Sequence, residues 1–289
     1  MRWIPLALVA CAACADDAPA GPADPNDVDG DGIPNAIDLC PNRQDPAQHD
    51  EDADGVGDAC DNCPATPNGN QADTTELQER QFPDGVGDAC DRRPKIADDT
   101  IAKFFPFADA LEASAFTGSG WTIAGDRATA TTARWFSKRN EAGDGITMQA
   151  HISKLEWPLP DGVVSVVVDG NGVDAGFNCS IVHSQSGDEL RIEQVGGAMN
   201  AMPIAAIQPT DRLLLSVSRA YTQLPTGHAA CFLGVNGGME LRIDIESIDD
   251  LAIGTYAVAA TDVTVQLDAA LVMTTPFACD TPFAKIACP

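Results

Sequence analysis

Two stretches of the sequence place aspartates at every second position and end in a glycine. Residues 27–32 read DVDGDG and residues 50–55 read DEDADG. In a loop that curls around an ion, alternate side chains point inward, so the carboxylates of each stretch converge. Glycine at the sixth position permits the sharp turn that such a loop needs. We therefore interpret both stretches as the beginnings of cation-binding loops.

Oxygen ligands at positions 1, 3, 5, 7, 9 and 12 complete each loop, with a backbone carbonyl at position 7. Several carboxylates in an all-oxygen set favour calcium over magnesium, because magnesium resists full dehydration. The spacing is that of an EF-hand loop, except that Asp stands at position 12 and that cysteine and proline follow in place of helices. The predicted calcium ligands are Asp27, Asp29, Asp31, Ile33, Asn35 and Asp38 in the first loop, and Asp50, Asp52, Asp54, Val56, Asp58 and Asp61 in the second.

A third loop is interrupted. The motif DGVGDACD occurs at residues 54–61 and again at 84–91, but counting back from its end places Phe82 and Arg80 where ligands are needed. We interpret residues 76–83 as an insertion, which leaves Thr75, a weaker ligand, at position 3. We expect this site to be weak, or to be rescued by Asp73 or Glu76. Its predicted ligands are Asp73, Asp84, Val86, Asp88 and Asp91.

The segments between the loops carry a second pattern. Cys40-Pro41 is followed by Asp45-Pro46, Gln48 and Asp50, and Cys63-Pro64 is followed at the same spacing by Asn68, Gln71 and Asp73. Together with the aspartate loops, this pattern resembles the thrombospondin type 3 repeat over residues 27–94. The resemblance implies a cysteine-stapled chain wrapped around calcium ions, with little regular secondary structure. It also implies the disulfides Cys40–Cys60 and Cys63–Cys90.

The charge of this region determines how it can fold. Residues 16–99 hold 22 Asp and Glu against 5 Lys and Arg, and the whole chain has a net charge of −26. A segment this acidic, with few large apolar residues, is either disordered or folded around cations. The same charge argues against nucleic acid and anionic membrane surfaces as partners.

The first residues are typical of an export signal. Arg2 precedes an apolar stretch, residues 3–10, which is much shorter than the roughly 20 residues that span a bilayer. Leu8-Val9-Ala10-Cys11 resembles the lipobox of bacterial lipoproteins, which implies lipidation of Cys11 and membrane attachment through lipid only. We expect an outer-membrane lipoprotein of a bacterial cell envelope. The alternative is a plain signal peptide and a secreted protein.

The ten cysteines fit an oxidising compartment. The sequence does not determine their connectivity. Pairing neighbours predicts Cys179–Cys231 and Cys279–Cys288 in the second half of the chain, and it leaves Cys14 without a partner.

The second half of the chain is predicted to form a β-sandwich or jelly roll. Apolar residues alternate in short stretches between residues 102 and 273, and turn signals such as DGNG at 169–172 and VNGG at 235–238 separate them. One short helix near 108–115 is compatible with the pattern. Residues 253–272 resemble the last strands of concanavalin A-like and laminin G-like sandwiches. The expected organisation of this mainly β protein is a signal peptide at 1–11, a flexible tether at 12–26, calcium-binding repeats at 27–95 and a β-sandwich at 96–289.

No catalytic constellation stands out in the predicted sandwich. Some glycosidases use carboxylates at alternate positions of one strand, but Arg242 stands where the first is needed before Asp244 and Glu246. We expect a solvated strand face there, and no enzyme. The leading hypothesis is a lipoprotein in which a calcium-rigidified stalk presents the sandwich for adhesion, or for binding a glycan or a cell-surface protein. The alternatives are a glycoside-active enzyme on the same sandwich and a purely structural spacer.

Overall fold

The structure is a computed structural model that describes residues 25–78, 81–91, 99–108, 117–138, 145–170, 176–220, 227–247 and 255–275. The described chain is mainly β, as predicted, and its one helix is a single turn, α1 (Thr75–Gln78). The first strands are β1 (Thr100–Phe105), β2 (Thr117–Ile123), β3 (Ala128–Lys138), β4 (Gly145–Glu156), β5 (Gly162–Gly170), β6 (Phe177–Ser184) and β7 (Gly187–Gln194). The remaining strands are β8 (Met199–Pro203), β9 (Leu213–Ala220), β10 (Gly227–Val235), β11 (Leu241–Ser247), β12 (Thr255–Thr261) and β13 (Thr264–Thr275).

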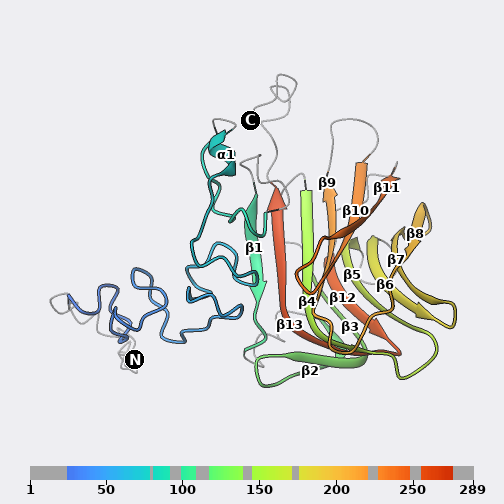
Figure 1. Ribbon diagram of the computed structural model, residues 1–289, viewed down its shortest axis with the longest axis horizontal. Coiled ribbons are helices and arrows are strands. Elements are labelled where there is room, and N and C mark those ends of the chain that lie inside the picture. Colours follow the sequence, from blue (N-terminus) through green and yellow to red (C-terminus); the bar gives the residue numbers. More distant parts are fainter. Residues whose placement is uncertain are drawn as a thin grey trace, which may run out of the picture.

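The strands follow one continuous order that folds over into two layers (Figure 1). The order is β11-β10-β9-β4-β13-β3-β12-β5-β6-β7-β8, with β1 beside β13 and β2 beside β3. β13 pairs with β4 along its length but with β3 only over residues 265–267, so the sheet turns there. One layer therefore contains β1, β13, β4, β9, β10 and β11, and the other contains the remaining strands. This is the predicted sandwich.

Successive side chains of a strand point to opposite faces of the sheet, so the alternation of apolar residues decides which face is buried. In β9, Leu213, Leu215 and Val217 belong to the core between the layers, and the residues between them face outward. The Cys179–Cys231 disulfide joins β6 of one layer to β10 of the other inside this core. The predicted pairing is confirmed, and the crosslink fastens the two layers together.

Two strands were not predicted, and both lie at the margins of the sheet order. β2 contains Gly118 and Gly120 and a register shift between Ser119 and Trp121, so apolar alternation is interrupted. β8 pairs with β7 only and ends at Pro203. Edge strands tolerate glycine, bulges and proline because one side has no neighbour to pair with. The helix expected near 108–115 falls outside the described residues, apart from residue 108.

The last part of the repeats lies against the sandwich. The Cys63–Cys90 disulfide and Val86 pack on Leu271 and Met273, which point out of the core from β13. In Figure 1 the first loop extends away from the sheet, whereas the later repeats run beside β1. A small apolar cluster therefore docks the end of the repeats onto the sheet, a contact that the sequence did not predict. No helix in the described parts of the chain has the length and apolar character to cross a membrane.

Candidate cation sites and the adjoining cavity

The three acidic loops share one hydrogen-bond frame. The backbone N–H at position 6 donates to the aspartate at position 1 in each loop, from Gly32 to Asp27 at 3.0 Å, from Gly55 to Asp50 at 3.0 Å and from Gly85 to Asp73 at 2.9 Å. The glycines have φ values of +94°, +93° and +93°, a region that residues with a Cβ disfavour. The third loop therefore begins at Asp73, as predicted, which is consistent with residues 76–83 being an insertion.

The aspartate at position 5 connects each loop to the segment that follows it. Its Oδ2 accepts a backbone N–H, from Asp45 to Asp31 at 2.9 Å and from Asn68 to Asp54 at 2.6 Å. In the third loop the same oxygen of Asp84 accepts the N–H of Asp99 at 2.7 Å, one residue before β1. The hydrogen bond that connects each of the first two loops to the segment after it has an equivalent in the third loop, where it connects the repeats to the sandwich.

Carboxylate oxygens gather inside the first two loops without donors for all of them. One oxygen each from Asp27, Asp29 and Asp31 lie within 4.8 Å of one another, and the same holds for Asp50, Asp52 and Asp54. Buried carboxylate oxygens that no donor reaches in the described chain include Oδ2 of Asp29, Asp38, Asp52 and Asp58. Burying a charged oxygen without a partner is costly, and a bound cation removes that cost. The donor set therefore fits the calcium ion that the sequence predicts.

Glu76 completes the third loop. It is the second residue of α1, it is 0% exposed, and neither of its carboxylate oxygens has a hydrogen-bond donor in the described chain. Its oxygens gather with those of Asp73 and Asp88, and with those of Asp84 and Asp91, each group within 4.8 Å. Thr75 contributes differently, since its N–H donates to Asp88 at 3.1 Å. The insertion therefore forms one helical turn that supplies the missing carboxylate, which the sequence indicated only as a possible rescue.

The remaining predicted ligands take equivalent places in the frame. At position 9, Asn35 and Asp58 accept the N–H at position 2 of their own loop. At position 12, Asp38 and Asp61 accept a cysteine N–H two residues later and the side chain of Gln48 or Gln71. At position 7, the N–H groups of Ile33, Val56 and Val86 donate to the aspartate at position 5 of the same loop. That their carbonyl oxygens bind the cation stays a prediction.

The disulfides of the repeats are those predicted, Cys40–Cys60 and Cys63–Cys90. Cys11, Cys14, Cys279 and Cys288 lie outside the described residues. Lipidation of Cys11 and the Cys279–Cys288 pair therefore stay predictions.

Burial and neighbouring charges shift the pKa values of the loop carboxylates. Burial raises the pKa of Asp52 to about 7, and the charges of Asp54 and Asp61 add to the shift. Burial also raises the pKa of Glu51 to about 8, with Asp268 of β13 the strongest charged contributor. Both carboxylates hold a proton at a pH where an isolated carboxylate has lost it. Because Asp52 belongs to the carboxylate group of the second loop, a proton and a cation compete for it.

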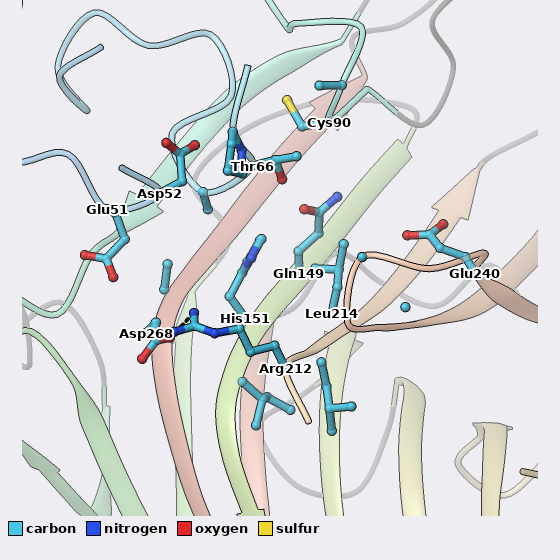
Figure 2. A pocket seen from close by; sticks show the side chains of 18 of the residues that line it. Glu51, Asp52, Thr66, Cys90, Gln149, His151, Arg212, Leu214, Glu240 and Asp268 are labelled. Carbon is cyan, nitrogen blue, oxygen red and sulfur yellow. Dashed lines mark hydrogen bonds and ion pairs between the residues drawn. The ribbon is translucent and has the colours of Figure 1, made fainter. Parts of the chain in front are cut away.

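A cavity of about 750 Å³ lies between the second and third loops and the outer face of the sandwich (Figure 2). The repeats contribute Glu51, Asp52 and Cys90 to its lining. The sheet contributes side chains from β4, β9 and β13 and from the turn between β10 and β11. Figure 2 shows the β4 side chains Gln149 and His151 pointing into this space. Sequence reasoning missed the cavity because its walls come from segments far apart in the chain.

Asp268 anchors one side of the cavity. It lies at a shift in the β13 register, where it has no strand partner. Its carboxylate accepts hydrogen bonds from Ser153 at 2.6 Å and from Arg127 at 3.1 Å, and Arg212 lies 3.5 Å away. This carboxylate is already balanced by donors, so it shapes the cavity wall more than it offers a free charge.

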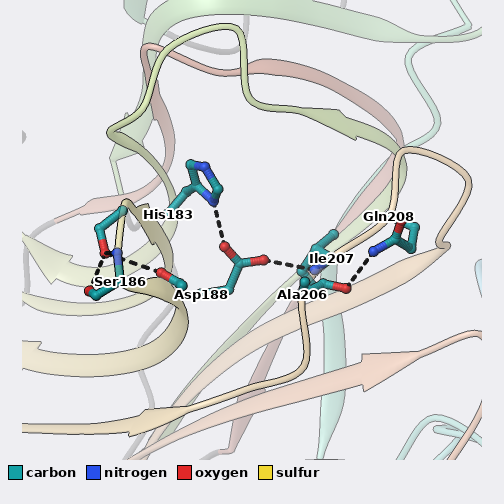
Figure 3. Close-up of polar contacts among 8 residues, drawn as sticks. His183, Ser186, Asp188, Ala206, Ile207 and Gln208 are labelled. Carbon is teal, nitrogen blue, oxygen red and sulfur yellow. Dashed lines mark hydrogen bonds and ion pairs between the residues drawn. The ribbon is translucent and has the colours of Figure 1, made fainter.

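Two further polar groups have structural roles. His183 Nδ1 lies 2.5 Å from Asp188 Oδ1, and Asp188 Oδ2 accepts the N–H of Ile207 at 2.7 Å (Figure 3). Because Asp188 is buried and both its oxygens are occupied, it fastens the β6–β7 hairpin to the segment after β8. On β11, Arg242 pairs with Asp244 at 2.7 Å on an exposed face, as expected for a solvated strand.

Comparison with known proteins supports the repeat assignment. Residues 14–48 and 45–71 match the family model of the thrombospondin type 3 repeat. The third loop lies beyond the matched residues, and its assignment rests on the hydrogen bonds that it shares with the other two loops. No curated protein matches the chain.

Similar solved structures include a legume lectin-like domain from Entamoeba histolytica, at 10% identity and a TM-score of 0.46, covering 59% of this chain and 95% of that one. The CBM2 module of the evolved Dit of Lactobacillus casei BL23 phage J-1 has 7% identity and a TM-score of 0.45, with 62% and 96% covered. A family 16 glycosyl hydrolase protein from Mycobacterium smegmatis has 12% identity and a TM-score of 0.41, with 60% and 100% covered. Because these TM-scores are low, the sandwich assignment rests on the strand pairing.

Proposed function

We propose that this chain, whose residues 14–71 are thrombospondin type 3 repeats, is an exported calcium-binding protein in which cation-filled repeats and a β-sandwich together bind a glycan. The observation that carries the proposal is the gathering of buried carboxylate oxygens without donors in three successive loops. Such oxygens repel one another in the absence of a cation, and the described repeats bury few apolar side chains to offset the repulsion.

The repeats should therefore depend on calcium for their fold. Binding a cation to the folded repeats and not to the unfolded chain stabilises them by mass action. The docking cluster around Val86 connects this stabilisation to the sandwich. The calcium-loaded protein is then one rigid body whose two parts share a surface.

Calorimetric titration of the full chain with calcium, together with circular dichroism before and after EDTA, tests the calcium part of the proposal. We expect saturable binding and a change of shape when EDTA removes the cation. Absence of calcium uptake at millimolar concentrations, with a spectrum indifferent to EDTA, would contradict it.

The sandwich part rests on the fold by analogy and on the polar cavity beside the repeats. Screening the calcium-loaded protein against printed oligosaccharides tests it, and retention of none of them would contradict it. Attachment of the protein to a bacterial envelope through a lipidated Cys11 belongs to the same proposal. Mass spectrometry of the membrane fraction tests it, since an unmodified Cys11 would exclude a lipid anchor.

A further inference from the structure

We propose that the cavity between the repeats and the sandwich is the saccharide site, and that it takes a short neutral or amino-bearing sugar only while the adjoining loops hold their cations. The proposal rests on the proposed function and adds the location, the chemical class and the calcium dependence of binding.

Gln149 is a buried polar side chain whose amide oxygen accepts no hydrogen bond in the described chain. It lies on β4 between Met148 and Ala150, which are in the core, so its own side chain leaves the sheet on the outer face. It is 1% exposed, and its Oε1 has no hydrogen-bond donor in the described chain. Figure 2 shows it directed into the cavity. A buried acceptor without a donor is unfavourable, so a ligand that brings an O–H or N–H group gains from reaching it.

Ser216 repeats this arrangement on the neighbouring strand. It pairs with Gln149 across β4 and β9, it is 0% exposed, and its Oγ also has no hydrogen-bond partner in the described chain. Two unsatisfied polar groups thus lie side by side on the same outer face. Ser216 does not line the cavity, so a ligand reaches only the amide of Gln149, which a sugar hydroxyl can satisfy because it both donates and accepts.

The charge of the lining selects among such ligands. Carboxylates come from both sides of the cavity, at Glu51, Asp52, Asp91, Glu240 and Asp268, against the guanidinium of Arg212. Arg212 is the one Lys or Arg of the described lining and it already lies near Asp268, and the whole chain has a net charge of −26. The field therefore disfavours sulfated and uronic saccharides and admits neutral or amino-bearing ones. The described lining has no Phe, Tyr or Trp, so hydrogen bonds and not ring stacking provide the recognition.

The walls of the cavity make saccharide binding depend on calcium. Asp52 and Asp91 line it and are also ligands of the second and third cation sites. Loss of the cations leaves their carboxylates to repel their neighbours, and the repeat side of the cavity then loses its fixed position. Because linkage is reciprocal, a bound saccharide also raises the affinity of the protein for calcium by the factor with which calcium raises the affinity for the saccharide.

The variant Gln149→Leu tests whether the saccharide binds in this cavity. It removes the amide but keeps a side chain of similar size, and Thr147→Val, on the same face of β4 and outside the cavity, is the matched control. We expect Gln149→Leu to lower the affinity of the calcium-loaded chain for retained neutral oligosaccharides at least tenfold, and Thr147→Val to leave it unchanged. Gln149→Leu should unfold at the same temperature as the parent protein or higher, because the amide has no partner to lose. Unchanged binding in Gln149→Leu overturns the location while leaving saccharide binding itself intact.

A printed panel of neutral, amino-bearing and sulfated oligosaccharides tests the chemical class of the saccharide and the dependence of its binding on calcium. Binding is measured in calcium and in EDTA, and calcium uptake is measured on the same sample. Retention of neutral or amino-bearing sugars in calcium and their release in EDTA supports the proposal. Preference for sulfated sugars, or retention in EDTA after the calorimeter shows that calcium has left, overturns it. Calcium uptake without retention of any saccharide also overturns it, and leaves the cation sites standing.

Discussion

Asp84 Oδ2 in the third cation loop accepts a hydrogen bond from the backbone nitrogen of Asp99 at 2.7 Å, one residue before the sandwich begins. The other oxygen of Asp84 accepts the N–H of Val86, which packs in the cluster between the repeats and β13. One carboxylate therefore shapes a loop, orients the residue that docks the repeats and holds the start of β1. Cation binding in this loop should stabilise the sandwich as well as the repeats.

The substitution Asp84→Asn should lower the free energy of unfolding of the calcium-loaded sandwich by about 1–3 kcal/mol, because it weakens a part-buried hydrogen bond to a charged acceptor and a cation site together. Asp31→Asn is the matched control, since Asp31 makes the same bond to Asp45 within the repeats. Urea denaturation followed by tryptophan fluorescence reports on the sandwich, where Trp121 and Trp157 pack against the core. Equal effects of the two substitutions would show that Asp84 does not couple the parts.

The substitution Glu76→Gln should remove cation binding at the third loop, because an amide supplies one neutral oxygen where two anionic ones lie buried. Calorimetric titration should show a lower calcium stoichiometry than in the parent protein. Gln78→Ala, an exposed position in the same helical turn, should leave the stoichiometry unchanged. A full stoichiometry in Glu76→Gln would place the third cation elsewhere.

Calcium affinity should rise with pH between about pH 5 and 8. The folded-state pKa of Asp52 is about 7, raised from 3.8, so the cation-free repeat takes up a proton as the pH falls through 7. A raised pKa stabilises the cation-free fold in acid, and that stabilisation is lost as the pH rises through 7, whereas the cation requires the ionised form. Titrations at pH 5.5 and 7.5, in buffers of different protonation heat, should show proton release on binding. Affinity that does not change with pH would show that Asp52 is not a ligand.

Removing the crosslink between the layers, by Cys179→Ala with Cys231→Ala, should lower the free energy of unfolding of the sandwich by about 4 kcal/mol. The two cysteines are separated by 52 residues, so the disulfide restricts a long stretch of the unfolded chain. Cys40→Ala with Cys60→Ala, within the repeats, should leave the sandwich transition in place. Thermal unfolding in calcium distinguishes the two pairs, and similar midpoints for both would contradict the role of the crosslink.

Much of the cation chemistry could be predicted from the sequence because it is local. The ligands of a loop follow one another within a dozen residues, so alternation and a glycine at the sixth position specify their convergence. The insertion was the exception. Whether Glu76 reaches the third site depends on the helical turn that residues 75–78 form, and residue order does not show this.

The sandwich was predicted as a class, since alternation of apolar residues reports which face of a strand is buried. The edge strands β2 and β8 were not predicted, because a strand with one neighbour needs no regular alternation of apolar residues. The pairing of β13 with β1, β3 and β4 also lay beyond the sequence, because it joins residues more than a hundred positions apart.

The sequence by itself determined how the carboxylates of each loop are spaced and where the cysteines of the repeats lie. Only the tertiary structure decided that the repeats dock on the outer face of β13, that Asp84 reaches Asp99, and that Gln149 is buried in the cavity between the repeats and the sheet. The physical reason is distance along the chain. Ligand spacing is set by consecutive residues, whereas docking depends on the packing of side chains that the fold brings together from both halves of the chain.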